Sequence, residues 1–310
     1  MTQPRDHGGG LDAAIAEFGG TRDGWLDLST GINPVPYPVG DLPNDAWTAL
    51  PDSGAMDRLL NAARAFWNVP DTAQIFAANG ASALISQMPR IARGMSVDVP
   101  KPTYNEHAAA FDAAGYDFDE TSPDVRVLVH PNNPDGRLWG LSKPAPLTIV
   151  DESFCDVKPD VSHIAATAKP GTIVLKSFGK FWGLAGARLG FAIAHPDTLS
   201  GLSDLIGPWS VNGPTLAIAE RALSDHDWAE ETRTRLSADA MRLDALMAQH
   251  GLIAQGGTSL FRLYDTENAA NAQRHLAQSH IWSRVFPYSD RWLRLGLPAP
   301  DRWRQLHDAL

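Results

Sequence analysis

Short apolar runs alternate with amphipathic stretches along the first two thirds of the chain. Buried strands are predicted before the turn at Asn79-Gly80, in MSVDV, at 125–129, in PLTIVDESF up to Asp151, at 172–175 and in RLGFAIAH. Apolar residues at helical spacing predict helices at 11–18 and 56–67 and a further helix from about Ala81. Strands that alternate with helices predict an α/β fold, a mostly parallel sheet with helices on both faces.

The pattern changes after about residue 205. A long polar helix is predicted at 227–250, followed by strands in GTSLFRLYD and RWLRLGLP and by helices at 267–278 and 301–310. This part predicts a smaller α+β domain, which the N-terminal segment completes. We therefore expect an N-terminal segment at 1–38, a large domain at 39–205 and a small domain at 206–310.

Polar side chains stand where several predicted strands end. Asp151 closes one strand, Asn133 lies in the turn after another, and Tyr104 lies in a loop between a strand and a helix. Ligands of open α/β sheets bind at the carboxyl ends of the strands. The turn before Ala81 and Ser82 adds a helix N-terminus, which favours a phosphate, although many such turns bind nothing.

The segment GTIVLKSFGKFWGLAGARLG carries a lysine on a turn beside a buried strand. Lys180 follows the hydroxyl of Ser177 and precedes Arg188. An amine, a hydroxyl and a guanidinium in this order suit pyridoxal 5'-phosphate, which needs a Schiff-base amine and a phosphate anchor. The alternative interpretation puts Lys180 and Arg188 on a solvated surface. Lys176 is a competing amine, but no arginine follows it at the same interval.

Composition limits the classes of function. The 310 residues are 44% hydrophobic and 20% charged with a net charge of −10, so no nucleic-acid surface is expected. A single cysteine excludes an intrachain disulfide, and no apolar run reaches membrane-spanning length. The first residues lack the apolar core of a signal peptide, so a cytoplasmic protein is expected. We assign no metal ligands, and Gly179-Lys180 lacks the surroundings of a P-loop.

Three motifs in order resemble the fold-type I, pyridoxal-phosphate-dependent enzymes of the class I/II aminotransferase family. They are HPNNPDG, VDESF and KSFGKFWGLAGARLGF, and the resemblance covers nearly the whole chain. It implies a large domain with a seven-stranded sheet, a smaller α+β domain and a homodimer. Within the group, HGGG, GINP and PTYNEHAAAF are most similar to the L-threonine O-3-phosphate decarboxylases of cobalamin biosynthesis.

The resemblance assigns roles to matching residues. Lys180 forms the Schiff base, Asp151 accepts a hydrogen bond from the pyridinium nitrogen, and Asn133 donates to the phenolic oxygen. Tyr104 stacks on the ring, and Arg294 binds the substrate carboxylate. His7 and Asn33 make other substrate contacts. The cofactor phosphate is bound by Ala81, Ser82, Ser177 and Arg188.

The implied reaction is decarboxylation of threonine phosphate to aminopropanol phosphate. The alternatives are an aminotransferase such as histidinol-phosphate aminotransferase, and a catalytically silent binding module. Three residues depart from the family pattern: Phe154 replaces a Tyr, Gly179 replaces a hydroxyl residue, and Leu50 stands where relatives have a Tyr that reaches the partner subunit. The segment between Asn133 and Asp151 is also short, which predicts a trimmed or missing crossover helix.

Overall fold

The computed structural model describes residues 5–143 and 145–310, and these residues form two compact units. The larger unit spans 36–133 and 138–231, and the smaller one spans the N-terminal residues up to Val35, 134–137 and 232–310. Nothing in the described part is a helix long and apolar enough to span a membrane.

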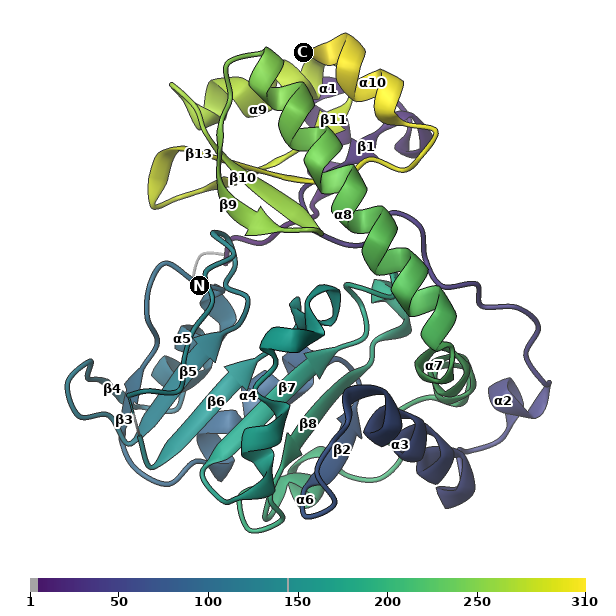
Figure 1. Cartoon of the computed structure of the whole chain (residues 1–310), viewed down its shortest axis with the longest axis vertical. Helices are drawn as coiled ribbons and strands as arrows, with labels where there is room; N and C mark the ends of the chain where they lie inside the picture. The colour runs from purple at the N-terminus through teal and green to yellow at the C-terminus, as the bar shows by residue number, and fades with distance from the viewer. Residues whose placement is uncertain (1–4, 144) are drawn as a thin grey trace. The chain divides into compact units, whose positions relative to one another are not determined.

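The larger unit is built on a seven-stranded sheet in the order β2-β8-β7-β6-β5-β3-β4 (Figure 1). Strands β3 to β7 run parallel to one another, whereas β8 is antiparallel to both β7 and β2. This confirms the predicted α/β fold with a mostly parallel sheet. The strands are β2 (Gln74–Ala78), β3 (Ser96–Asp98), β4 (Asp117–Phe118), β5 (Val125–Val129), β6 (Leu147–Asp151), β7 (Thr172–Ser177) and β8 (Gly190–Ala194).

Helices cover this sheet with apolar faces that the sequence spacing predicts. In α3, the buried residues Leu59, Ala63 and Trp67 recur every four positions, which is one face of a helix. The core under α4, α5 and α6 joins aliphatic side chains of the sheet to Leu84, Met88, Phe111 and Leu202. The helices are α2 (Asp45–Thr48), α3 (Ser53–Trp67), α4 (Ala81–Ile91), α5 (Asn105–Ala113), α6 (Leu202–Ile206) and α7 (Gly213–Ser224), with short 3₁₀ turns at Cys155–Val157, Pro159–Val161, Ile164–Ala168 and Ala185–Ala187.

The smaller unit contains a four-stranded antiparallel sheet in the order β12-β13-β10-β9. A separate parallel pair, β1 with β11, joins the N-terminal segment to the C-terminal part. The stretch GTSLFRLYD is not one strand, because a turn at residues 259–260 separates β9 from β10. The elements are α1 (Leu11–Phe18), a 3₁₀ turn (Arg22–Gly24), β1 (Leu26–Asp27), α8 (His226–Gln249), β9 (Ala254–Thr258), β10 (Phe261–Asp265), α9 (Ala269–Gln278), β11 (Ile281–Trp282), β12 (Arg284–Phe286), β13 (Ser289–Gly296) and α10 (Trp303–Ala309).

The boundary between the two units lies further along the chain than the sequence pattern predicts. The division falls inside α8 at 231/232, whereas the sequence places it at 205/206. The reason is that α7 packs on α3 in the larger unit, where Arg58 and Glu220 form an ion pair of 3.1 Å. The N-terminal boundary lies at 35/36, close to the expected 38/39.

Candidate active site

Three strands and the start of one helix meet at Gly190. It is paired with Ala78 at the end of β2 and with Ser177 at the end of β7. A β-carbon on Gly190 would overlap the backbone nitrogen of Ala81, the first residue of α4. Only glycine therefore lets the N-terminus of α4 approach the sheet this closely. Ser177 and the first turn of α4, which the sequence assigns to one phosphate, lie at the same place.

Arg188 belongs to the same cluster. Gly80, which caps α4 with a φ of 88°, lies directly against the Arg188 guanidinium. Arg188 itself has a φ of 53°, a left-handed conformation that is uncommon outside glycine and occurs often at ligand sites. A guanidinium beside a helix N-terminus creates a strongly electropositive position, as a phosphate anchor requires.

Tyr104 links this cluster to the rest of the site. Its hydroxyl is hydrogen-bonded to Ser82 in the first turn of α4. Burial, with the negative charges of Glu106 and Asp151, raises the pKa of Tyr104 to about 12, so the phenol is neutral at physiological pH. The side chain also lies edge-on to His107, with ring centroids 6.1 Å apart.

Asn132 holds two of the predicted residues in place. Its side-chain nitrogen donates to the carbonyl of Pro102 at 3.0 Å, and its oxygen accepts from Thr103 at 2.6 Å. These bonds tie the loop before Tyr104 to the turn that contains Asn133. Asn133 is half-buried just beyond the end of β5.

Asp151 closes β6 as predicted, and its carboxylate is almost fully buried with 2% exposure. One oxygen of Asp151 accepts a hydrogen bond of 2.9 Å from the Ser153 amide and one of 2.5 Å from the Ser153 hydroxyl. The other lies 2.8 Å from Nε2 of His107 on α5. Burial disfavours the charged form, but the hydrogen bonds from His107 and Ser153 outweigh it and lower the pKa of Asp151. The carboxylate therefore stays ionised at neutral pH and can hold a proton on a bound heteroaromatic nitrogen.

The two competing lysines have different surroundings. Lys176 is the fifth residue of the run in β7, is fully buried, and contacts Glu152 at 2.7 Å and Asp156 at 3.4 Å. Burial alone would lower its pKa, but these two carboxylates raise it, so Lys176 remains an ammonium and is a poor nucleophile. Lys180 is half-buried on the turn after β7, with its Nζ 5.4 Å from the centre of the Phe154 ring. Of the two, Lys180 is the amine on the turn beside Ser177.

The departures from the family pattern have local explanations. A β-carbon on Gly179 would lie 3.0 Å from Cα of Ala185, so a hydroxyl residue there would need the 185–187 turn to move. Leu50 is 68% exposed within this chain. Among the described residues between β5 and β6 there is no helix, in agreement with the expectation of a missing crossover helix.

In the smaller unit, Arg294 on β13 is almost completely buried. It donates to the carbonyl of Ser29, and its guanidinium carbon lies 5.0 Å from the centre of the Phe261 ring. Burial and the neighbouring charge of Arg284 lower the pKa of Arg294 to about 9. Arg284, which pairs with Arg294 across β12 and β13, forms an ion pair of 2.6 Å with Asp6, so its charge is already matched within the chain.

His7 and Asn33 lie on the N-terminal segment, which belongs to the smaller unit. The backbone carbonyl of His7 accepts from Arg284, and its side chain is exposed. The Asn33 side chain is buried, and its oxygen accepts from the Val35 amide at 3.0 Å and from Arg235 at 2.8 Å. That oxygen thus shapes the N-terminal segment. Substrate contact by either residue stays a prediction.

The sequence did not single out three residues that lie near predicted ones: His107 and Glu152 in the larger unit, and Arg284 in the smaller unit. His107 could have been found, since it lies only three residues after Tyr104 in PTYNEHAAAF, in the first turn of α5. Glu152 follows Asp151 directly in VDESF, but its pairing with Lys176 depends on the register of β6 and β7. Arg284 had no local signal.

The side chains in the larger unit fit pyridoxal phosphate. The ionised carboxylate of Asp151 matches the pyridinium of the cofactor. The N-terminus of α4, with an arginine and a hydroxyl, matches the phosphate, and the lysine on the adjacent turn matches the aldehyde. The close approach of Gly190 to Ala81 would be lost with any other side chain at position 190.

Comparison with known proteins shows extensive similarity. The family model described as aminotransferase class I and II matches residues 119–309. A threonine-phosphate decarboxylase of Pseudomonas aeruginosa is 39% identical over 98% of this chain and 97% of its own length, and one from Sinorhizobium is 38% identical over 100% and 98%. A histidinol-phosphate aminotransferase of Chromobacterium violaceum is 28% identical over 93% and 92%. The structure of a histidinol-phosphate aminotransferase from Sinorhizobium meliloti, solved with pyridoxal-5'-phosphate, shares the fold, with a TM-score of 0.85 at 19% identity over 100% of this chain and 94% of its own.

Proposed function

Because the chain belongs to the aminotransferase class I and II family, we propose that it decarboxylates L-threonine O-3-phosphate. The product would be (R)-1-amino-2-propanol O-2-phosphate, and the pathway cobalamin biosynthesis. The observation that carries the proposal is the end-to-end similarity to two threonine-phosphate decarboxylases at 39% and 38% identity. The aminotransferase alternative is supported by a full-length relative at 28% identity.

Family membership makes the protein a pyridoxal-phosphate-dependent enzyme, which confirms the predicted cofactor and enzyme class. The alternative of a catalytically silent binding module has no support in these relatives. When bound, the cofactor supplies an electron sink for the charge that develops at the substrate Cα.

The residues of the larger unit supply the cofactor site in this proposal. Asp151 would hold a proton on the ring nitrogen, because its buried carboxylate is kept ionised by His107. Lys180 would hold the cofactor covalently. Arg188 would bind the cofactor phosphate together with the first turn of α4, Ser82 and Ser177. Asn133 would contact the ring oxygen and Tyr104 the ring face.

In the smaller unit, Arg294 supports a substrate with a carboxylate. Its guanidinium would bind that carboxylate in a bidentate contact. Threonine phosphate carries both a carboxylate and a phosphate. In this proposal, Arg294 would orient the bond between Cα and the carboxylate for loss of carbon dioxide, and the bound cofactor would take up the charge left at Cα.

The test uses the purified protein with added pyridoxal phosphate. Threonine phosphate should release carbon dioxide, and unphosphorylated threonine, the matched control, should lose turnover as well as affinity. Formation of a keto acid from histidinol phosphate or glutamate without release of carbon dioxide would favour the aminotransferase alternative instead.

The proposal includes a homodimer in the cytoplasm. Apolar side chains with large exposed fractions occur on the larger unit at Val39 (45%), Trp47 (69%), Leu50 (68%) and Trp209 (59%), which is consistent with a surface that a second copy covers. The start of α7 lies against α2, because a β-carbon on Gly213 would be 2.3 Å from the carbonyl oxygen of Ala46. Sedimentation at micromolar concentration tests the dimer, and a fully active monomer would contradict it. Fractionation of cells tests the location.

A further inference from the structure

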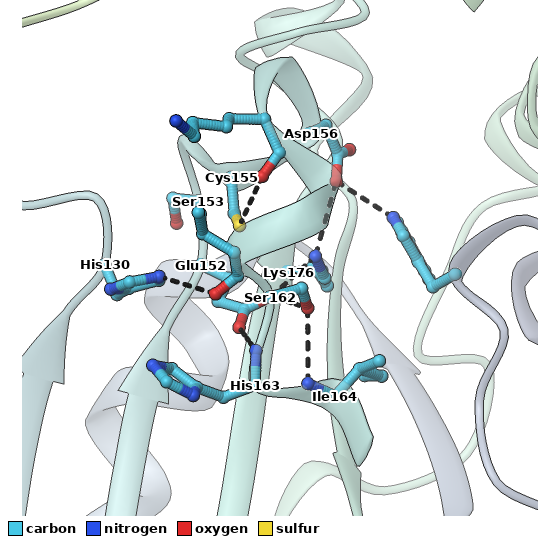
Figure 2. A network of polar contacts seen from close by, with 12 residues as sticks. His130, Glu152, Ser153, Cys155, Asp156, Ser162, His163, Ile164 and Lys176 are labelled. Carbon is cyan, nitrogen blue, oxygen red and sulfur yellow. Dashed lines mark hydrogen bonds and ion pairs between the residues drawn. The ribbon is translucent and has the colours of Figure 1, made fainter. Parts of the chain in front are cut away.

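Behind the candidate cofactor site lies a buried network of charges that the proposed chemistry does not use. Figure 2 shows Lys176 between the carboxylates of Glu152 and Asp156. The side chains of the three residues are 2%, 0% and 6% exposed. Asp156 also accepts a hydrogen bond of 2.9 Å from the indole nitrogen of Trp67. We call Lys176, Glu152 and Asp156 the Lys176 network.

The network joins the strand ends that carry Asp151 and Lys180. Glu152 follows Asp151 directly, and its amide donates to the carbonyl of Leu175 at 2.8 Å. Asp151 is the last residue of β6 in register with β7, where its partner is Leu175. The ion pair between Glu152 and Lys176 therefore lies immediately beyond the last paired position of β6 and β7. There it fixes the path of the backbone after both strands.

The network also reaches the segment after β6 (Figure 2). Glu152 accepts from the Ser162 hydroxyl and from the His163 amide, each at 2.6 Å. The His163 ring lies 4.5 Å from that of His130, centre to centre, and Nε2 of His130 lies 2.9 Å from the carbonyl of Val161. His130 follows β5 and leads into the turn with Asn133. Three strand ends are thus connected through one carboxylate.

Stability alone is a weak reason for such a network. Removing charges from water costs several kcal/mol per ion by general estimates, and well-packed apolar residues in place of a buried ion pair are often as stable or more so. An ion pair has strict geometry, however, and so it can define a register that apolar packing leaves loose.

We propose that the Lys176 network is a positioning device, with Lys176 as its central residue, that fixes the Asp151 carboxylate relative to Ser177 and Lys180. The proposal depends on the proposed function only because it takes these residues as the cofactor site. Lys176 and Glu152 touch neither substrate nor cofactor in this assignment. They act through the backbone ends that carry the residues that do.

The test compares Lys176→Met with Lys176→Arg, which keeps the charge, and with Arg126→Met. Arg126 forms another buried ion pair in the same sheet, with Asp98 at 2.9 Å and side-chain exposures of 7% and 9%. Its loss should reduce stability in the same way without affecting the strand ends at the site.

Two measurements are made on each variant. In the cofactor-free protein, hydrogen exchange of the His163 amide should become faster by about tenfold or more in Lys176→Met, the factor expected for loss of one hydrogen bond to a charged group. The dissociation constant for pyridoxal phosphate should rise by a similar factor of about ten. Lys176→Arg should restore both values in large part, and Arg126→Met should change neither.

Ser162→Ala keeps every buried charge paired and serves if Lys176→Met does not fold. It should show the same two changes, again by about tenfold or more, because the Ser162 hydroxyl donates to the charged carboxylate of Glu152. A variant of the network with faster exchange but a wild-type dissociation constant would overturn the positioning role. If the wild-type protein binds no pyridoxal phosphate, the cofactor assignment fails instead, and exchange in the cofactor-free protein still decides whether the network holds the strand ends.

Discussion

The contact between His107 and Asp151 should contribute to the stability of the protein, and this can be tested without the cofactor. Nε2 of His107 lies 2.8 Å from the Asp151 carboxylate, both side chains are buried, and Nδ1 of His107 has no hydrogen-bond partner among the described residues. In His107→Gln the side-chain amide nitrogen can take the place of Nε2. In His107→Asn the amide is too short to reach the carboxylate. The two variants thus differ in one hydrogen bond.

The expected size follows from the burial of the carboxylate. A hydrogen bond to a charged group contributes about 1.5–3 kcal/mol, so His107→Asn should lower the free energy of unfolding at pH 7 by about that amount. One pKa unit corresponds to about 1.4 kcal/mol, so the pKa of Asp151 should rise by about one to two units. His107→Gln should retain most of the stability.

The pH dependence gives a second check. The pKa of Asp151 is lowered in the folded protein, so its contribution to stability is present above the unfolded value of about 3.9 and is lost as the pH falls through the folded value. In His107→Asn the gap between the two values narrows or reverses, and the acid-side loss of stability attributable to Asp151 becomes smaller or changes sign. Urea unfolding of the cofactor-free variants at several pH values measures both effects. Equal stability of the Asn and Gln variants would refute the reasoning.

Three further predictions concern the cofactor and the substrate. Borohydride reduction and peptide mapping should label Lys180, and a label on Lys176 would contradict the assignment. Gly190→Ala should weaken binding of pyridoxal phosphate by about tenfold or more, because the new β-carbon overlaps the start of α4. Equilibrium dialysis measures this binding. Gly140→Ala is the control, because a β-carbon there meets nothing within 4 Å. Arg294→Lys should cost about 1.5–3 kcal/mol in kcat/KM for threonine phosphate, because a bidentate contact becomes a single one, and kinetics that match the wild type would exclude Arg294 as the carboxylate ligand.

Much of the fold could be predicted because the information is local. Strand β5 and helix α1 have the predicted ends, since apolar periodicity and flanking turn residues define such elements without help from the rest of the chain. The boundary between the two units could not be read in this way. The composition changes near residue 205, but α7 packs on α3, which is far away in the sequence.

The sequence by itself determined the alternation of the main strands and helices in the larger unit, the strand-end position of Asp151, and the turn that carries Lys180. These depend on spacing over a few residues. Only the tertiary structure decided which charges are paired, because those contacts join β5, β6, β7 and α5 across the sheet. Lys176 and Lys180 look alike as amines in one segment, and only the carboxylates of Glu152 and Asp156 keep the buried Lys176 an ammonium. The electrostatic state of a side chain depends on burial and on neighbours that the chain brings together from a distance, and short-range periodicity carries no record of either.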